Sequence, residues 1–213
     1  FLFLFFVIIK DSYSFEYSGI NGDYKVKIID NRIIKVKERP EPLSVRISAP
    51  QKNSLSPLII FSHGSRCHVD GSNDLSNYWS SHGYTVIQPL HLDGYLKSRK
   101  KSHSREEISF HRLRDMSLVI DKIKLLLSNE KEILNIIDSS KIIAAGHSYG
   151  ALVAQVMGGA KIFSQEEPSK KISSLDKRFR TIVAISPPGY MKNFVDSDSA
   201  KSISIPMLVT TGT

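Results

Sequence analysis

The stretch Gly146-His-Ser-Tyr-Gly150 constrains the fold of this chain more than any other. An apolar run at residues 141–145 precedes it and predicts a buried β-strand, and a second run at 151–157 predicts a buried helix. A serine with a glycine two positions away on either side, between a strand and a helix, is the pattern of a nucleophile elbow. The sequence therefore places Ser148 at a sharp strand-to-helix turn.

The glycines of this stretch explain how such a turn can form. Backbone on either side of the serine passes close to the strand and the helix, so only glycine or something nearly as small fits at Gly146 and Gly150. The turn would expose the Ser148 hydroxyl and place the Tyr149 N–H where a developing oxyanion can be held. The alternative is that Ser148 is the N-cap residue of an ordinary turn, which needs no chemistry.

Composition limits the class of protein. At 213 residues with 41% hydrophobic content, the chain can form a single soluble domain with a sizeable core. The single cysteine, Cys67, excludes an internal disulfide framework and argues against a cysteine-based zinc site. The net charge of +8 comes mainly from scattered lysines and one dense run at residues 97–105. No aromatic residues interleave that run, so we interpret it as a solvated loop and expect no nucleic-acid partner.

The first residues differ in composition from the rest. Phe1–Ile9 are all apolar and Lys10 follows them. Nine residues are too few to span a bilayer, so we expect no stable membrane span, but they fit the apolar core of a signal peptide. We therefore interpret residues 1–16 as a remnant of a signal or export segment of a secreted or periplasmic protein. A first β-strand of a cytoplasmic protein is the alternative.

Hydrophobic periodicity indicates an α/β fold. Alternating residues predict an antiparallel hairpin at 24–29 and 32–37 with its turn at Asp30-Asn31. Further strands are predicted at 43–47, 57–61, 84–88, 180–185 and 205–210, and helices near 75–82 and at 111–128. The later strands alternate with helices, which predicts a mostly parallel sheet with antiparallel N-terminal strands. The helix at 111–128 is amphipathic, and the face opposite its apolar stripe carries charged residues such as Arg112 and Asp115.

A second candidate element follows the predicted strand at 57–61. His63-Gly64-Ser65 come soon after the strand, and Gly64 permits a sharp turn of the backbone. In an elbow architecture, the second donor of an oxyanion hole comes from such a loop, and here it would be the Ser65 N–H beside the Tyr149 N–H. A simple turn at the end of a strand is the alternative.

Several blocks in register carry a family resemblance. They are Pro57–Gly64, Trp79–Pro89, Arg112–Asp121, Gly146–Gly150, Ile185–Gly189 and Ile205–Gly212. In these blocks the chain resembles the α/β-hydrolase superfamily and, within it, the predicted dienelactone hydrolase and platelet-activating-factor acetylhydrolase-like group. The neighbouring polyester-hydrolase and chlorophyllase-like families share the elbow and the loop at the strand end.

The resemblance implies a serine hydrolase that cleaves carboxylic esters. Ser148 would attack the ester carbonyl, a histidine would accept its proton, and the Tyr149 and Ser65 N–H groups would hold the oxyanion. Water would then release the acyl-enzyme, with no metal or organic cofactor. The substrate would be a small-molecule or lipid-like ester. Tyr190 and Phe194 are candidate contacts in its pocket, although both could equally anchor a loop.

The acid and the base of a catalytic triad are missing from the expected positions. In this fold the chain order is serine, acid, histidine, yet all seven histidines precede Ser148. His147 is interpreted as a packing or hydrogen-bonding residue. In many members of the family the acid comes after the strand that ends near residue 211, and some animal members place it where this chain has Ser186. Asp196 and Asp198 are minor candidates.

We therefore expect residues 17–213 to form a single α/β-hydrolase domain that is C-terminally incomplete. The fragment would stop before its acid, its last strand and its histidine, and by itself it would be inactive. The alternative function is a non-catalytic α/β-hydrolase-like binding or scaffold protein that keeps Ser148 for reasons of fold.

Overall fold

A computed structural model gives the structure of the chain and describes residues 20–95, 103–164, 171–191 and 194–211. The proposed signal segment at 1–16 lies outside the described residues, as do residues 97–102 of the basic run. Among the described residues, no helix has the length and the apolar character to cross a membrane.

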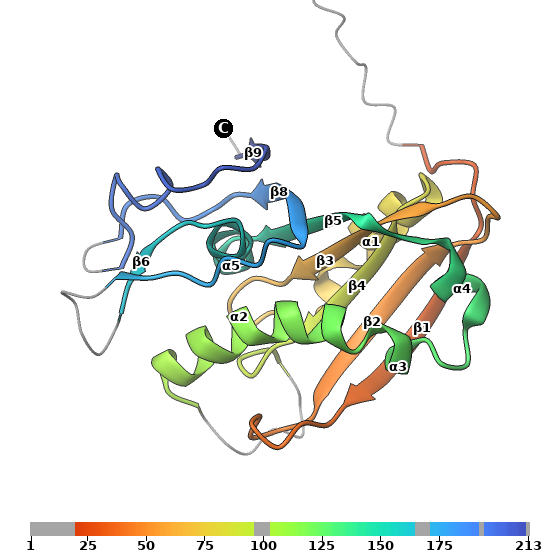
Figure 1. Cartoon of the computed structure of the whole chain (residues 1–213), viewed down its shortest axis with the longest axis horizontal. Helices are drawn as coiled ribbons and strands as arrows, with labels where there is room; N and C mark the ends of the chain where they lie inside the picture. Colours follow the sequence, from red (N-terminus) through yellow and green to blue (C-terminus); the bar gives the residue numbers. More distant parts are fainter. Residues whose placement is uncertain (1–19, 96–102, 165–170, 192–193, 212–213) are drawn as a thin grey trace, which may run out of the picture.

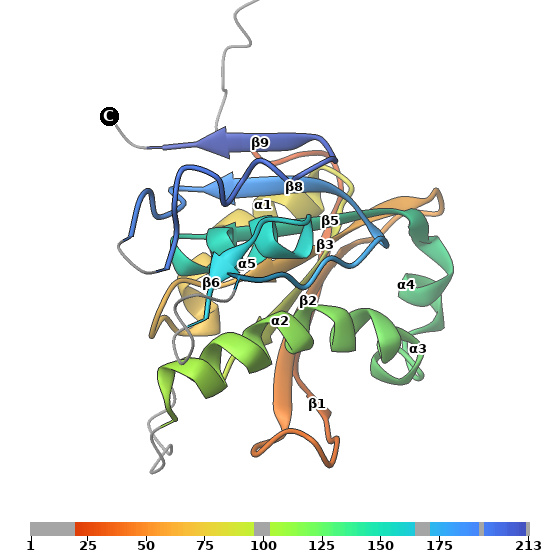
Figure 2. The ribbon, with the colours of Figure 1, turned by 60° about the vertical axis from the view of Figure 1, so that its left-hand side comes forward.

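A seven-stranded mixed sheet forms the centre of the molecule (Figures 1 and 2). Its spatial order is β1-β2-β4-β3-β5-β8-β9. The pairs β1–β2 and β2–β4 are antiparallel, and all later neighbours are parallel. The strands are β1 (Val26–Ile34), β2 (Leu43–Pro50), β3 (Ser56–Ser62), β4 (Thr85–Leu90), β5 (Ile137–His147), β8 (Phe179–Ile185) and β9 (Met207–Thr210). The predicted α/β-hydrolase fold with antiparallel N-terminal strands is therefore confirmed.

The predicted N-terminal hairpin is wrong. Residues 26–34 form one strand that pairs along its length with β2, and Asp30 and Asn31 make a bulge in it. The register places Ile29 opposite Ile47 and Arg32 opposite Val45, so two residues of β1 face one residue of β2. Asn31 has a φ of 54°. Asp30-Asn31 therefore does not form a turn between two strands. It provides a left-handed residue at a bulge within one strand.

Helices cover both faces of the sheet. On one face lie α2 (Arg105–Asp121) and α5 (Tyr149–Met157), and α1 (Asn73–Ser81) lies on the other (Figure 1). Alternate residues of β3 point into the two resulting cores. Leu58 and Ile60 belong to the core under α2 and α5, whereas Ile59 and Phe61 pack with Trp79 of α1. This alternation explains why β3 is apolar throughout.

The predicted helix at 111–128 begins earlier and is interrupted. It begins after Ser104, whose hydroxyl accepts a hydrogen bond from the Glu107 N–H at 3.1 Å. It ends at Asp121, and a short helix α3 (Ile123–Leu126) follows. The minor elements are a 3₁₀ turn (Val69–Ser72), α4 (Lys131–Ile136) and the two-residue strands β6 (Ile162–Phe163) and β7 (Lys171–Ile172).

Candidate active site

Ser148 lies at the turn between β5 and α5, as the sequence predicted. Its backbone has a φ of 54° and a ψ of −120°, a conformation that non-glycine residues rarely adopt. The turn is fixed on both sides, because the Ser148 N–H donates to the Ile185 carbonyl at 2.9 Å and the Ser148 carbonyl accepts from the Ala151 N–H at 2.9 Å. Backbone strain of this kind is concentrated at functional sites, so the conformation of Ser148 favours a functional role for this residue.

The two glycines of the elbow permit close packing of backbone on backbone. A Cβ atom at Gly146 would overlap the carbonyl group of Gly150. A Cβ atom at Gly150 would overlap the carbonyl oxygen of Ser62, at the end of β3. The glycine at position 150 therefore brings the elbow against β3, at the carboxyl edge of the parallel strands where ligands bind in open α/β sheets.

The loop that follows β3 lies beside the elbow. A Cβ atom at Gly64 would lie 3.3 Å from Nδ1 of His147 and 3.1 Å from Sγ of Cys67. Ser148 and Tyr149 are partly exposed, and Ser65 and His147 are exposed. The structure thus brings together Ser148, Tyr149 and the loop that contains Ser65, which are three parts of the site that the sequence predicted separately.

A buried polar cluster that the sequence did not predict lies under this loop, and Arg112 of α2 is at its centre. The side chain of Arg112 is fully buried. Its Nε and Nη2 atoms donate to the two carboxylate oxygens of Asp93, each at 2.9 Å. Its other donations go to the His63 carbonyl at 2.7 Å, the Gly64 carbonyl at 3.1 Å and the Ser62 hydroxyl at 3.2 Å.

Arg112 also reaches the elbow from below. Its guanidinium carbon lies 4.7 Å from the ring centroid of Tyr149, the residue after the nucleophile candidate. The Tyr149 hydroxyl is 2.6 Å from the Ser109 hydroxyl, one helical turn before Arg112. The face of α2 that was predicted to lie opposite the apolar stripe is thus partly buried against the loop and the elbow. That part of the amphipathic prediction is wrong for Arg112 and Asp115.

The cluster continues through His91 at the end of β4. The Nε2 atom of His91 is 2.9 Å from the Ser62 hydroxyl, and its Nδ1 atom is 2.9 Å from the Asp115 carboxylate. Asp115 also accepts from Nε of Arg39 at 2.8 Å. All these groups are buried. Although serine, histidine and aspartate line up here as in a triad, Ser62 is fully buried and substrate has no access to it.

The cluster sets the protonation of its members. Burial would raise the pKa of Asp93, but the hydrogen bonds and the charge of Arg112 outweigh it and hold that pKa at about 2. Burial, and then the charge of Arg112, lowers the pKa of His91 well below its usual value. Burial likewise lowers the pKa of His63, with further contributions from His91 and Arg112. Both imidazoles are therefore neutral, and the Arg112–Asp93 pair is ionised.

No histidine in the described part of the chain forms a hydrogen bond with the Ser148 side chain. His63 is within the loop, but Nδ1 lies 2.7 Å from the Gly64 carbonyl and Nε2 accepts from the His91 N–H at 3.1 Å. Both of its nitrogens are therefore in use. The two minor candidates for the acid pair elsewhere, Asp196 with Lys171 and Asp198 with Lys201.

The two candidate pocket residues differ in exposure. Phe194 is 8% exposed and belongs to the core, and its ring centroid lies 6.3 Å from that of Tyr149. Tyr190 is 76% exposed. Phe194 thus supports the residue after the nucleophile candidate, whereas Tyr190 is open to solvent.

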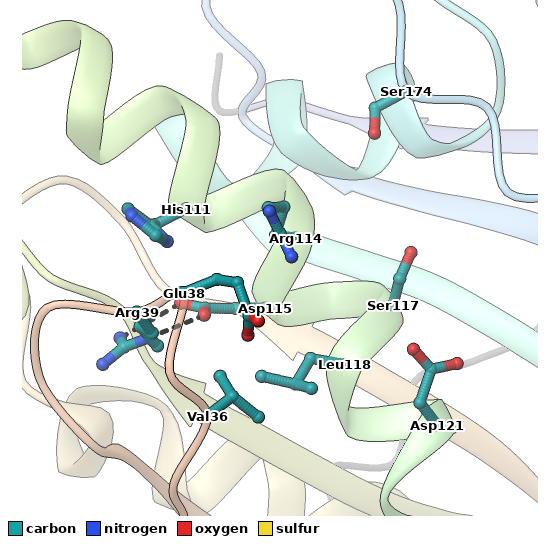
Figure 3. Close-up of a pocket in the computed structure, with 10 residues that line it drawn as sticks. All are labelled: Val36, Glu38, Arg39, His111, Arg114, Asp115, Ser117, Leu118, Asp121 and Ser174. Carbon is teal, nitrogen blue, oxygen red and sulfur yellow. Dashed lines mark hydrogen bonds and ion pairs between the residues drawn. The ribbon is translucent and has the colours of Figure 1, made fainter.

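A small cavity of about 170 Å³ lies elsewhere, between α2 and the segment after β1 (Figure 3). Figure 3 shows two of the lining residues, Arg39 and Asp115, paired with each other, and Arg114 and Ser117 along α2. Its lining includes no residue of the elbow or of the 63–65 loop. We therefore assign the candidate site to the elbow and not to this cavity. Within the described ranges, no group of three or more histidine, cysteine or acidic side chains is placed to hold a metal ion.

Part of the buried cluster had a sequence signal. Arg112, Asp115 and Met116 are spaced by three and four residues, so they share one stripe of the helix with the buried Val119. An arginine and an aspartate on an apolar stripe suggest a buried ion pair. Their partners could not be found in this way, because Asp93 and Gly64 are distant in the sequence.

Comparison with known proteins agrees with the fold. The family model of chlorophyllase matches residues 17–192, which is more than half of the chain. The comparison with curated proteins gives no match. The chlorophyllase family is one of the neighbouring families that the sequence resembled, whereas the resemblance to the dienelactone hydrolase group is not confirmed. On this match, together with the sheet order and the turn at Ser148, the chain belongs to the chlorophyllase family, whose members are carboxylic-ester hydrolases of the α/β-hydrolase type.

Proposed function

We propose that this protein is a serine esterase whose nucleophile is Ser148. The observation that carries the proposal is the backbone of Ser148, strained at a φ of 54° and held by the Ile185 carbonyl at the carboxyl edge of the sheet. The family supports ester hydrolysis in general. The geometry supports the assignment of the reaction to this serine, since the turn leaves it partly exposed at the first turn of α5.

In the proposed mechanism the Ser148 hydroxyl attacks the ester carbonyl and forms a tetrahedral intermediate. The negative oxygen of the intermediate is held by the N–H groups of Tyr149 and Ser65. Collapse of the intermediate expels the alcohol and leaves an acyl-enzyme, which water hydrolyses. The reaction as proposed requires no metal or organic cofactor. No described histidine is bonded to the Ser148 side chain, so the proposal assigns the general base and its acid to none of them.

The substrate we propose is a carboxylic ester with a lipid-like part. The name of the family makes chlorophyll, with its long-chain ester, one substrate to test. The partly exposed ring of Tyr149 is apolar surface at the elbow, and the buried Phe194 packs behind it, with ring centroids 6.3 Å apart. Tyr190 could add a contact from its exposed position.

The test uses the full-length protein with p-nitrophenyl butyrate and with chlorophyll. We expect hydrolysis of the nitrophenyl ester and its loss in Ser148→Ala, with the fold retained by circular dichroism. The matched control is Ser197→Ala, which removes an exposed serine and should keep the wild-type rate. Equal rates in wild type and Ser148→Ala would refute the assignment of the nucleophile.

A second candidate function is a non-catalytic binding or scaffold role. The observation in its favour is that no described histidine is bonded to Ser148. A full-length protein that binds esters but releases no alcohol, and whose Ser148 does not react with a fluorophosphonate, would support it.

A further inference from the structure

Arg112 contacts both sides of the proposed oxyanion hole. On one side it donates to the carbonyl groups of His63 and Gly64, and on the other it lies under the ring of Tyr149. This is the same side chain that ties α2 to the end of β3, and it is fully buried below the loop.

The bond to Gly64 bears directly on the Ser65 donor. The Gly64 carbonyl and the Ser65 N–H belong to the same peptide group, which is planar and trans, so its C=O and N–H point in opposite directions. The Gly64 oxygen also lies 2.7 Å from Nδ1 of His63 and accepts from the Cys67 N–H at 3.3 Å, so Arg112, at 3.1 Å, is one of three donors that fix the direction of the Ser65 N–H. It also polarises the peptide, which makes the N–H a stronger donor.

Arg112 and Asp93 together carry no net charge. Arg112 is therefore expected to act by orienting the loop and not by attracting the oxyanion directly. Arg112 makes two hydrogen bonds of 2.9 Å to the ionised Asp93, which largely cancels its charge at a distance. Such fork-to-fork pairs have a fixed geometry. Arg112 is thus held in place before any substrate binds, which is the condition for a preorganised oxyanion hole.

We propose that Arg112 is a positioning residue, which helps to set the direction of the Ser65 N–H through the Gly64 carbonyl and supports the Tyr149 side of the same hole. This inference rests on the proposed function of Ser148. It assigns Arg112 no contact with the substrate. The consequence is that Arg112 controls the rate of formation of tetrahedral species and leaves binding of the ground-state ester nearly unchanged.

The test compares Arg112→Lys with Arg178→Lys in the full-length protein. Lysine keeps the charge but cannot bond Asp93 and the two carbonyls at once. Arg178 is a suitable control because it also ties a loop to α2, through Asp121 and the Ser117 carbonyl, yet it does not touch the 63–65 loop. We measure kcat and KM for p-nitrophenyl butyrate, the rate of fluorophosphonate labelling, and the melting temperature.

For Arg112→Lys we expect kcat and the labelling rate to fall by about 10- to 100-fold, somewhat less than the loss on deleting a donor, while KM changes less than about 3-fold. Arg178→Lys should retain kcat even where its melting temperature falls. If Arg112→Lys does not fold, Asp93→Asn provides a second variant. In it we expect kcat and the labelling rate to fall by about 3- to 10-fold, with KM again nearly unchanged. Partial recovery of kcat in Arg112→Ala on addition of guanidinium, without recovery of the melting temperature, would support a positioning role.

The outcomes separate the two proposals. If wild-type Ser148 does not react with the fluorophosphonate, the proposed function fails and this inference fails with it. If wild type reacts but a folded Arg112→Lys or Asp93→Asn reacts at the same rate, the inference alone is overturned. It is also overturned if the loss appears in KM and leaves kcat unchanged.

Discussion

The guanidinium of Arg112 donates to the carbonyl oxygen of Gly64 at 3.1 Å, directly behind the peptide group whose N–H belongs to Ser65. A helix residue thus reaches the backbone of a loop that lies 48 positions earlier in the chain. The bond connects α2 with the loop after β3. The same guanidinium also lies against the ring of Tyr149 and so contacts the elbow. The candidate site is therefore built on a buried ion pair under the loop, not on the loop alone.

The close packing at Gly150 leads to a stability prediction. Gly150→Ala should lower the free energy of unfolding by about 3 kcal/mol, the upper part of the range for overpacking, because its Cβ would overlap the Ser62 carbonyl. Gly71→Ala is the matched control, since a Cβ there meets nothing within 4 Å. Urea denaturation measures both. Equal stability of the two variants would contradict the close approach of the elbow to β3.

The buried histidines predict how stability depends on pH. Burial lowers the pKa of both His63 and His91 well below 6.5, so below that pH the unfolded chain binds protons that the folded chain does not. Stability is therefore full above about pH 7 and falls as the pH decreases, by up to about 2.7 kcal/mol per pH unit for two groups. The raised pKa of Asp115, a consequence of its burial, acts in the opposite direction at lower pH.

Urea denaturation between pH 7 and pH 5.5 measures this slope. His91→Asn should reduce it by no more than about half, since His63 remains and burial also lowers the pKa of His111. His82 is exposed, and His82→Asn provides the control with an unchanged slope. A wild-type stability that is constant across this range would show that the imidazoles are not buried as neutral groups.

The pair of Asp115 with Arg39 predicts a large cost for removing one partner. Asp115→Ala leaves Arg39 and His91 buried without their acceptor, and such losses cost about 3–5 kcal/mol. Asp198→Ala breaks the exposed pair with Lys201 and should leave the free energy of unfolding unchanged within error. Thermal and urea denaturation decide between them. A loss for Asp115→Ala no larger than that for Asp198→Ala would be inconsistent with the buried network.

The proposed use of the Ser65 backbone predicts a contrast between two substitutions. Ser65→Pro removes the N–H and should lower kcat by about 10²- to 10³-fold, the usual cost of one oxyanion donor. Ser65→Ala keeps the N–H and should cost far less. Steady-state kinetics on p-nitrophenyl butyrate compares them. Similar losses in the two variants would mean that the Ser65 side chain, and not its N–H, is what matters.

The elbow could be predicted from the sequence because its requirements are local. Gly146 and Gly150 are needed where backbone meets backbone, and the apolar runs on either side identify the strand and the helix. The strand β3 and its Gly64 turn were predictable for the same reason. Each of these features is set by residues within a few positions of one another.

What the sequence missed depends on contacts between distant residues. Asp30-Asn31 suits a turn as well as a bulge, and only the pairing with β2 along its whole length selects the bulge. Arg112 and Asp115 carry charges that normally face solvent, and only partners from other strands and loops allow their burial. The spacing of Arg112 with Met116 was the available sign that this face of α2 is buried.

The central claim is that Ser148 is the nucleophile, and covalent labelling tests it most directly. The full-length protein is treated with a fluorophosphonate, digested, and analysed by mass spectrometry, beside Ser148→Ala. We predict one phosphonylated peptide that carries the adduct on Ser148, and no adduct on Ser62 or in the Ser148→Ala variant. An unlabelled wild-type protein, or an adduct that persists in Ser148→Ala, would contradict the claim.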